Sequence, residues 1–347
     1  MKNNKKIVIL ALLSLIILVF TGCGAKDKTE EGSSKLPKEV KIGIIRVPND
    51  KQVAISQKYF DEYFKDKGIK TKFMFFDSGV AANKALSSNS IDFAEMGYTN
   101  GVVALATDIP AELIWIHEVL GTNEALVTPK DSGITDIKQL KGKKIATPFS
   151  STSHFSLLQA LKIAGIEKDV TLLDMETNDI VAAWERGDLD AAYTWEPTLS
   201  TLKETGNVLI DSKTLAEKGF MTVNIDLVNT EFSKKYPELV EDYIKTLNKG
   251  VEYYKENPED AAKGAAKELG IEPSDALEQM QGTTWLNMSE QVSADYLGTE
   301  AKPGKFHDVF KETAVFLNNQ KSISNVPSDD EIHNFINSSY IEKAMKK

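Results

Sequence analysis

The residues best suited to hold a small anion lie together in one short stretch. Four hydroxyl residues, Ser150 to Ser153, are followed by His154, between a strand pattern over 143–146 and an apolar helical pattern that begins at Phe155. Side chains of this kind at a helix start accept hydrogen bonds from the free N–H groups of the first turn. The remaining N–H groups and the helix dipole favour an anion. The same residues also suit a plain helix cap, to which His154 could contribute.

A second group of residues suits the opposite charge. Trp195 and Glu196 end a strand pattern, and ligands of open α/β sheets bind beyond the carboxyl ends of the strands. An ammonium group could pair with Glu196 against the face of Trp195, while an anionic group binds the N–H groups at Ser151 and Thr152. The two groups together predict a small ligand with an anionic and a cationic end. Core packing of Trp195 and a solvated loop position for Glu196 remain alternatives.

Further polar or aromatic side chains follow other predicted strands. A structural role is an open alternative for Tyr98 and Glu118, as it is for large aromatic and carboxylate side chains in general. The remaining candidates for the rim of the same site are Asp77, Ser150 and Thr99.

Strand and helix patterns alternate along most of the chain, which predicts a parallel or mixed sheet flanked by helices. The segments around Ile91-Asp92-Phe93-Ala94 and Leu189-Asp190-Ala191-Ala192 share one order of features: a helix, a polar turn and a strand that begins hydrophobic-Asp-x-Ala. This weak repeat is compatible with two similarly built lobes. Continuous helical patterns are expected over 53–68 and, near the C-terminus, over 329–345.

The first residues have the pattern of a secretion signal. Three lysines precede an apolar run from Ile7 to Phe20, too short for a comfortable membrane span, and small residues follow it. A short membrane anchor that is retained is the alternative. Cys23, the single cysteine of the chain, resembles the lipidated cysteine of bacterial lipoproteins, although Phe20 stands where that pattern usually has Leu. We therefore predict a signal peptide over 1–22 and a flexible tether over 23–39.

Charge and motif content exclude several function classes. The net charge is −10, and removal of the leader with its three lysines makes it −13, which argues against nucleic acid as a partner. None of the common nucleotide-binding, hydrolase or metalloprotease motifs is present. The four histidines show no metal-ligand spacing. The sequence thus predicts no catalytic residues, no metal and no cofactor.

Several long motifs resemble one known family. Four segments look like the corresponding parts of periplasmic taurine-binding proteins of ABC importers: Thr147 to Lys162, Ile180 to Trp195, Phe76-Asp77-Ser78-Gly79, and Gly121 to Val127. The resemblance runs from about Val40 into the C-terminal region. The wider family includes binding proteins for alkanesulfonates, nitrate and pyrimidine precursors.

The resemblance implies an α/β, two-lobed type II periplasmic binding protein fold with two crossover segments and a ligand cleft between the lobes. Lobe 1 would comprise 40–122 and the helical part 221–347, and lobe 2 would comprise 123–220. The chain would be a monomer, anchored through Cys23 on the outer face of the cell membrane, that delivers taurine to an ABC permease. An exported enzyme that uses His154 as an acid–base group and a surface sensor are alternatives.

Two positions depart from the family pattern. Glu196 stands where a small residue is expected after the Trp, and Asn224 occupies a position associated with Asp. We interpret the pair as a relocation of the carboxylate that binds the ammonium group, with Asn224 still in the ligand site.

Overall fold

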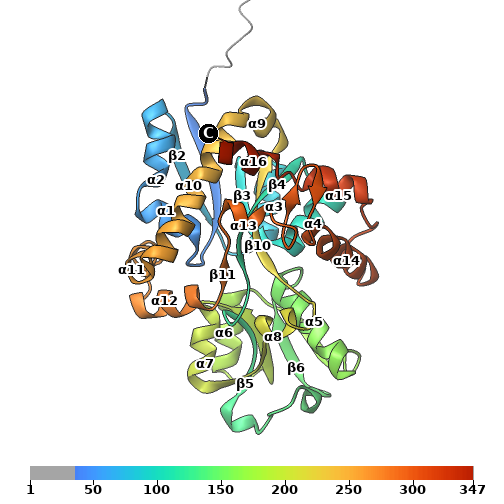
Figure 1. The fold of residues 1–347 in the computed structure, drawn as a ribbon. Coiled ribbons are helices and arrows are strands. Elements are labelled where there is room, and N and C mark those ends of the chain that lie inside the picture. The colour runs from blue at the N-terminus through green and yellow to red at the C-terminus, as the bar shows by residue number, and fades with distance from the viewer. Residues whose placement is uncertain (1–35, 347) are drawn as a thin grey trace, which may run out of the picture. The chain divides into compact units, whose positions relative to one another are not determined.

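The computed structural model describes residues 36–346 (Figure 1). The predicted signal peptide, Cys23 and most of the predicted tether lie outside the described residues. Within 36–346, no helix combines the length and the apolar character that a membrane span requires.

The first sheet is built from strands at both ends of the described chain. Its strand order is β11-β4-β10-β3-β1-β2, with β1 parallel to β2 and β3 and with β10 antiparallel to both of its neighbours. We call this sheet and the helices packed on it lobe 1. Its strands are β1 (Glu39–Ile45), β2 (Lys70–Phe76), β3 (Phe93–Gly97), β4 (Ala111–Val119), β10 (Val223–Asn229) and β11 (Thr284–Trp285).

The second sheet repeats this layout. Its order is β7-β6-β8-β5-β9, with β6 parallel to β7 and β8 and with β5 antiparallel to both of its neighbours. In each sheet, the strand that arrives from the other sheet, β10 or β5, runs antiparallel to both of its neighbours. This sheet and its helices form lobe 2; its strands are β5 (Glu124–Pro129), β6 (Lys144–Thr147), β7 (Thr171–Asp174), β8 (Ala191–Trp195) and β9 (Gly206–Asp211).

Helices cover both faces of each sheet. Figure 1 shows α1, α2 and α10 on one side of the lobe 1 sheet and α4, α14 and α15 on the other. The lobe 1 helices are α1 (Asp50–Ser56), α2 (Tyr59–Tyr63), α3 (Gly79–Ser87), α4 (Tyr98–Ala106), α9 (Thr230–Lys235), α10 (Pro237–Glu256), α11 (Pro258–Leu269), α12 (Pro273–Gln281), α13 (Met288–Gln291), α14 (Phe306–Asn319), α15 (Asp329–Phe335) and α16 (Ser339–Lys346).

In lobe 2, the two faces of the sheet carry separate apolar cores. Leu157 and Leu215 belong to the core beneath α5 and α8, and Ile180 and Leu202 belong to the core beneath α6 and α7. The helices are α5 (Thr152–Ala164), α6 (Thr177–Glu185), α7 (Thr198–Thr205) and α8 (Ser212–Ala216). The short remaining elements of the chain are η1 (Lys65–Lys67), η2 (Lys130–Ser132), η3 (Ile137–Leu140), β12 (Gly298–Thr299) and β13 (Lys302–Pro303).

The weak sequence repeat marks equivalent positions in the two sheets. The Asp92 carboxylate accepts a hydrogen bond from the backbone N–H of Lys41 at 2.7 Å, and the Asp190 carboxylate accepts one from the N–H of Lys144 at 2.9 Å. Each aspartate therefore ties the strand that follows it to the first parallel strand of its sheet, β1 or β6. The sequence repeat thus corresponds to the same aspartate–backbone hydrogen bond directly before β3 and β8.

Two secondary-structure predictions were wrong, and strands β9 and β10 were not predicted. The continuous helix over 53–68 is broken at Lys58, whose φ of 61° lies in the left-handed region, so that α1, α2 and η1 replace it. The C-terminal helix over 329–345 is interrupted where Ile336 makes a bridge to Leu113 of β4. Strand β10 was missed, because its run from Val223 to Asn229 mixes apolar and polar residues ahead of a long helical region.

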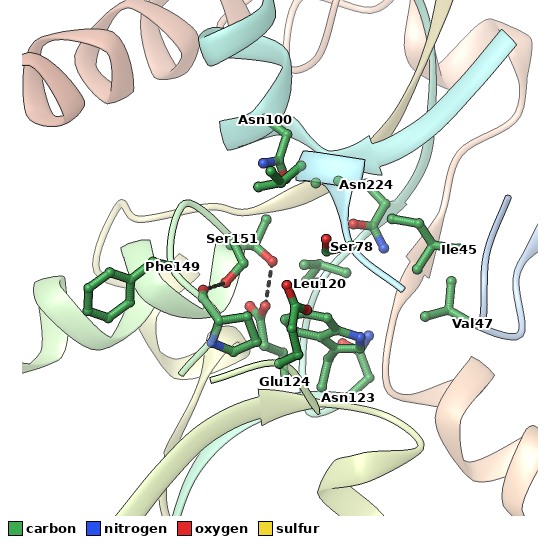
Figure 2. Close-up of a pocket in the computed structure, with 17 residues that line it drawn as sticks. Ile45, Val47, Ser78, Asn100, Leu120, Asn123, Glu124, Phe149, Ser151 and Asn224 are labelled. Atoms are coloured by element: carbon green, nitrogen blue, oxygen red, sulfur yellow. Dashed lines mark hydrogen bonds between the residues drawn. The ribbon is translucent and has the colours of Figure 1, made fainter. Parts of the chain in front are cut away.

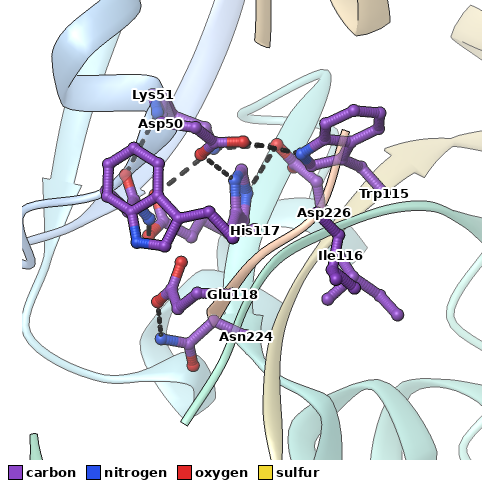
Figure 3. Close-up of polar contacts among 12 residues, drawn as sticks. Asp50, Lys51, Trp115, Ile116, His117, Glu118, Asn224 and Asp226 are labelled. Atoms are coloured by element: carbon purple, nitrogen blue, oxygen red, sulfur yellow. Dashed lines mark hydrogen bonds and ion pairs between the residues drawn. The ribbon is translucent and has the colours of Figure 1, made fainter. Parts of the chain in front are cut away.

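Lobe 1 also buries a network of charged side chains (Figure 3). Lys51 Nζ lies 2.8 Å from Asp226 Oδ2 and 3.3 Å from Glu95 Oε2, and His117 Nδ1 lies 2.6 Å from Asp50 Oδ1. Burial alone would lower the pKa of His117, but the charge of Asp50 and the hydrogen bonds to both aspartates raise it to about 10. His117 is therefore charged at neutral pH. The network joins α1 to strands β3, β4 and β10.

A candidate ligand pocket between the two lobes

A pocket of about 550 Å³, partly open to solvent, lies between lobe 1 and lobe 2 (Figure 2). That volume includes space that is open to solvent. Figure 2 shows Asn100, Asn224 and Ile45 of lobe 1 on one side of it, and Glu124 and Asn123 on the other. The full lining is Ile45, Val47, Ser78, Gly79, Val80, Gly97, Asn100, Leu120, Asn123, Glu124, Pro148, Phe149, Ser151, Thr152, Glu176, Trp195 and Asn224.

The start of α5 forms one wall of this pocket. Ser151 is the N-cap residue: its Oγ accepts a hydrogen bond from the His154 N–H at 3.1 Å and donates one to the Pro148 carbonyl at 2.6 Å. The Phe155 N–H is bonded to the Ser151 carbonyl. The N–H groups of Thr152 and Ser153 have no acceptor within the helix, as at any helix start. They remain available to an anionic group of a ligand.

Gly97 lets lobe 1 come close to this helix start. A Cβ atom at Gly97 would lie 2.8 Å from Cγ2 of Thr152, closer than real side chains approach. Beside it, the Thr99 hydroxyl donates a hydrogen bond to the Ser150 carbonyl at 2.9 Å. Thr99 thus joins the two lobes next to the pocket but is not part of its lining.

Glu124 lies beneath the helix start and is fully buried. Its Oε1 accepts hydrogen bonds from the hydroxyls of Thr152 at 2.5 Å and Ser153 at 2.8 Å, and its Oε2 accepts one from Ser212 at 2.6 Å. Burial raises the pKa of Glu124, against the lowering effect of these hydroxyl donors. Because the two α5 hydroxyls are directed at Glu124, they do not compete for the N–H groups above them.

His154 is not among the residues that line the pocket. Its ring stacks on Phe149 with centroids 4.3 Å apart, and its Nδ1 accepts a hydrogen bond from the Ser150 N–H at 3.2 Å. Burial lowers the pKa of His154 to about 4, although Asp174 opposes the shift. The ring is therefore neutral at pH 7 and stabilises the turn before α5, where Ser150 has a φ of 63°.

Trp195 and Glu196 are adjacent in the sequence, but only Trp195 belongs to the pocket lining. Trp195 lines the pocket and pairs with Glu124 across strands β8 and β5. Glu196 is buried outside the lining: its Oε2 accepts a hydrogen bond from the Ser200 N–H at 2.8 Å, and its Oε1 lies 3.6 Å from Lys203 Nζ. Burial raises the pKa of Glu196, against the hydrogen bonds from Ser200. The predicted pairing of the two residues around one cation is therefore absent from this geometry.

Three other predicted site residues lie outside the lining, in the core, on the surface or in contact with a lining residue. Tyr98 is fully buried, with its hydroxyl 2.8 Å from Thr313 Oγ1, and Asp77 is exposed outside the lining. Glu118 contacts the pocket only through Asn224, whose Nδ2 donates a hydrogen bond to Glu118 Oε1 at 2.6 Å. Of the predicted residues, the structure brings Ser151, Thr152, Trp195 and Asn224 to the lining, and it leaves Ser150, His154, Glu196, Tyr98, Thr99, Asp77 and Glu118 outside it.

A cluster of carboxylates lies at the pocket edge on lobe 2. Glu176, the N-cap residue of α6, lines the pocket. Burial raises its pKa, as do the charges of Asp174, Asp77 and Asp179, whereas a hydrogen bond to Ser78 lowers it. Because Asp77 and Ser78 belong to lobe 1, residues of both lobes influence the pKa of Glu176.

Sequence reasoning missed Glu124, Glu176, Asn100 and Asn123. Glu124 carries a usable signal, because a carboxylate directly before the apolar run Ala125-Leu126-Val127 is placed for burial and then requires partners. Asn100 and Asn123 carry no such signal, since amides are common in ordinary loops and helix starts.

The family model described as NMT1/THI5 like matches residues 60–261. The chain belongs to this family. It is 32% identical over 274 residues to the taurine-binding periplasmic protein of Escherichia coli (strain K12), which covers 77% of this chain and 83% of the relative. It is 30% identical over 344 residues, 97% of each chain, to a protein of Bacillus subtilis (strain 168) named as a candidate aliphatic sulfonates-binding protein.

Solved structures show the same fold for this NMT1/THI5-like chain. The alkanesulfonate-binding protein SsuA from Xanthomonas axonopodis pv. citri, bound to MOPS, superposes with a TM-score of 0.70 at 21% identity and covers 84% of this chain and 96% of its own. The desulfurization enzyme DSZB superposes with a TM-score of 0.64 at 16% identity and covers 89% of this chain and 99% of its own. The predicted two-lobed periplasmic binding protein fold is confirmed, and this fold also occurs in an enzyme.

Proposed function

We propose that the chain is the substrate-binding protein of an ABC importer and that its ligand is taurine. The open start of α5 in the wall of a pocket between two lobes carries this proposal. Thr152 lines the pocket, the N–H groups of Thr152 and Ser153 have no acceptor within the helix, and Glu124 accepts hydrogen bonds from the hydroxyls of both residues. Such a helix start binds a sulfonate through hydrogen bonds and the helix dipole. The two named relatives, a taurine-binding and an aliphatic sulfonates-binding protein, support the same ligand class.

The ammonium end of taurine would meet Trp195 and a negatively charged part of the lining. Glu176, with Asp77 and Asp174 close to it, supplies this charge at the pocket edge. Cations are attracted to the faces of Trp rings and to carboxylates. Glu196 was expected in this role, but its carboxylate is already engaged by Ser200 and Lys203. We therefore assign the role to Glu176.

Calorimetry with taurine, ethanesulfonate and nitrate tests the proposal. Ethanesulfonate keeps the anionic group and lacks the ammonium, and nitrate keeps only a small anion. Tight taurine binding with weaker ethanesulfonate binding is the expected result. Equal binding of the two sulfonates would favour an alkanesulfonate carrier, and preferred binding of nitrate would remove sulfonates from the proposal.

Ligand turnover distinguishes the carrier from an enzyme. An acid–base role for His154 has no geometric support, since the neutral ring stacks on Phe149 and lies outside the pocket lining. Taurine incubated with the protein for many hours and recovered unchanged is the expected result. Release of sulfite or ammonia above the level of a blank would establish catalysis.

We infer the location of the protein from the signal and cysteine pattern of its first residues. We propose that cleavage before Cys23 and lipidation of that cysteine anchor a monomer on the outer face of the membrane, next to the permease. The acidic net charge supports small-molecule binding over nucleic acid. Expression of the Cys23→Ser variant should move the protein from the membrane fraction to the medium, while taurine affinity stays unchanged.

A further inference from the structure

Asn224 lines the pocket, and one end of its side-chain amide is hydrogen-bonded to a residue outside the lining. It lies near the start of β10, the strand that returns from lobe 2 to lobe 1, and pairs there with Glu118 of β4. Its Nδ2 donates a hydrogen bond to Glu118 Oε1 at 2.6 Å. Figure 3 shows the amide oxygen on the side away from Glu118.

The direction of this hydrogen bond depends on the charge state of Glu118. An ionised carboxylate only accepts hydrogen bonds, so the amide must turn its NH₂ group toward Glu118 and its oxygen away from it. A protonated carboxyl group can donate instead, and the amide can then turn its oxygen toward Glu118 and its NH₂ group outward. The two states therefore offer opposite hydrogen-bonding groups on the Asn224 side of the pocket.

The surroundings of Glu118 make both states accessible. Glu118 is 2% exposed, and its Oε2 has no hydrogen-bond partner among the described residues. Burial raises the pKa of Glu118 to about 8; Glu95 of β3 and Asp50 of α1 add to the shift, and His117 of β4 and the Asn224 amide oppose it.

The other charged groups of this region are already paired with one another. Lys51 of α1 is bound to Asp226 of β10 and to Glu95, and Asp226 also contacts His117. Strand β11 pairs with Glu118 through Trp285, which carries no charge. Glu118 is thus a buried carboxyl group whose direct hydrogen bond is made with the pocket residue Asn224.

We propose that Glu118 is a positioning residue that sets the specificity of the pocket by fixing which end of the Asn224 amide faces the ligand. With Glu118 ionised, the Asn224 oxygen accepts a hydrogen bond from a cationic or donor group, which selects aminosulfonates over plain alkanesulfonates. With Glu118 protonated, this preference is lost. The inference rests on the proposed function, because it refines the choice among sulfonates.

The test compares taurine and ethanesulfonate by calorimetry from about pH 6 to about pH 8.5. In the natural protein, the ratio of taurine to ethanesulfonate affinity should rise with pH, by roughly tenfold if taurine lowers the pKa of Glu118 by one unit. Taurine binding near pH 7 should also release protons, seen as a dependence of the heat on the buffer. Ethanesulfonate binding should not.

Variants separate positioning from general structural damage. Glu118→Gln should make the affinity ratio independent of pH and abolish the proton release, and in an Asn224→Ala background it should have no further effect on the ratio. Glu112→Gln is the matched control. Glu112 lies on the same strand and accepts a hydrogen bond from Asn337 Nδ2 at 3.1 Å, away from the pocket lining.

Two outcomes would overturn the positioning role. In the first, Glu118→Gln weakens both sulfonates equally, as a purely structural residue would. In the second, the pH dependence of the ratio survives in Glu118→Gln. If the natural protein binds neither sulfonate, the proposed function itself is wrong, and this inference falls with it. Far-UV circular dichroism and urea denaturation of each variant establish that it is folded.

Discussion

Thr152 Oγ1 donates a hydrogen bond of 2.5 Å to Oε1 of Glu124, within the wall of the pocket. The contact joins the first turn of α5 to the first residue of β5, the strand that enters lobe 2 from lobe 1. It explains how a carboxylate can lie beneath a site suited to an anion. The Glu124 oxygens are occupied by hydroxyl donors, and the backbone N–H groups of the helix start are left for the ligand.

Replacement of Glu124 by Ala should destabilise the protein. The hydroxyls of Thr152, Ser153 and Ser212 would lose their common buried acceptor, at a cost of about 1–3 kcal/mol in the free energy of unfolding. Taurine affinity should fall as well, because freed hydroxyls disturb the helix start. Urea denaturation and calorimetry measure the two effects. Glu185 is exposed, so Glu185→Ala should change neither the free energy of unfolding nor the taurine affinity. If both quantities stay unchanged in Glu124→Ala as well, the role given to the Glu124 carboxylate is contradicted.

A comparison of two helix-cap variants separates an effect on stability from an effect on ligand binding. Ser151 caps α5 at the pocket, and Ser328 caps α15, where it accepts a hydrogen bond from the Glu331 N–H. Ser151→Ala and Ser328→Ala should each lower the free energy of unfolding by about 1 kcal/mol. Only Ser151→Ala should also weaken sulfonate binding. Equal affinities of the two variants for taurine would show that the α5 start does not contact the ligand.

Glu176 and Glu196 are alternative partners for the ammonium group. Glu176→Gln should weaken taurine binding and leave ethanesulfonate binding nearly unchanged, because only taurine carries the positive charge. Glu196→Gln should leave both affinities close to those of the natural protein, since Glu196 is engaged by Ser200 and Lys203. A loss of a few kcal/mol in taurine binding for Glu196→Gln, the size of a broken buried charge pair, would instead restore the sequence-based assignment.

The charge of His117 should make stability depend on pH. Its pKa in the folded protein, about 10, lies above the ordinary value of 6.5, so the folded state binds this proton more tightly than the unfolded chain. The stabilisation is complete below about pH 6.5 and is lost as the pH rises toward 10. His117→Gln should therefore lower the free energy of unfolding at pH 7 and flatten its decline above that pH.

Urea denaturation at a series of pH values measures this dependence. The exposed His333→Gln is the control and should follow the natural protein. Glu118 also makes the free energy of unfolding decline, but at lower pH. Its pKa is raised from 4.5 in the unfolded chain to about 8 in the folded protein, so its contribution is lost as the pH rises toward 8. A decline above pH 8 that persists in His117→Gln would contradict the assignment to His117.

Local sequence patterns predicted the α/β class of the chain and one feature that its two sheets share. The alternation of apolar runs and helical periods predicted the α/β class, and the hydrophobic-Asp-x-Ala repeat marked the two strands whose aspartates, Asp92 and Asp190, bind equivalent backbone groups. The helix start at Ser151 was also readable, because capping depends on residues three positions apart. Strand β10 was not, since its place in the sheet depends on partners more than 100 residues away.

The sequence by itself determined that the chain has a helix start fit for an anion and two lobes to enclose it. Only the tertiary structure decided which carboxylates and amides face that helix start. Glu196 follows Trp195 directly, yet its side chain turns to Ser200, while Glu124 and Asn224 reach the pocket or its floor from distant strands. The physical reason is that neighbours along a strand point to opposite faces, whereas a pocket collects side chains through sheet pairing and lobe contact.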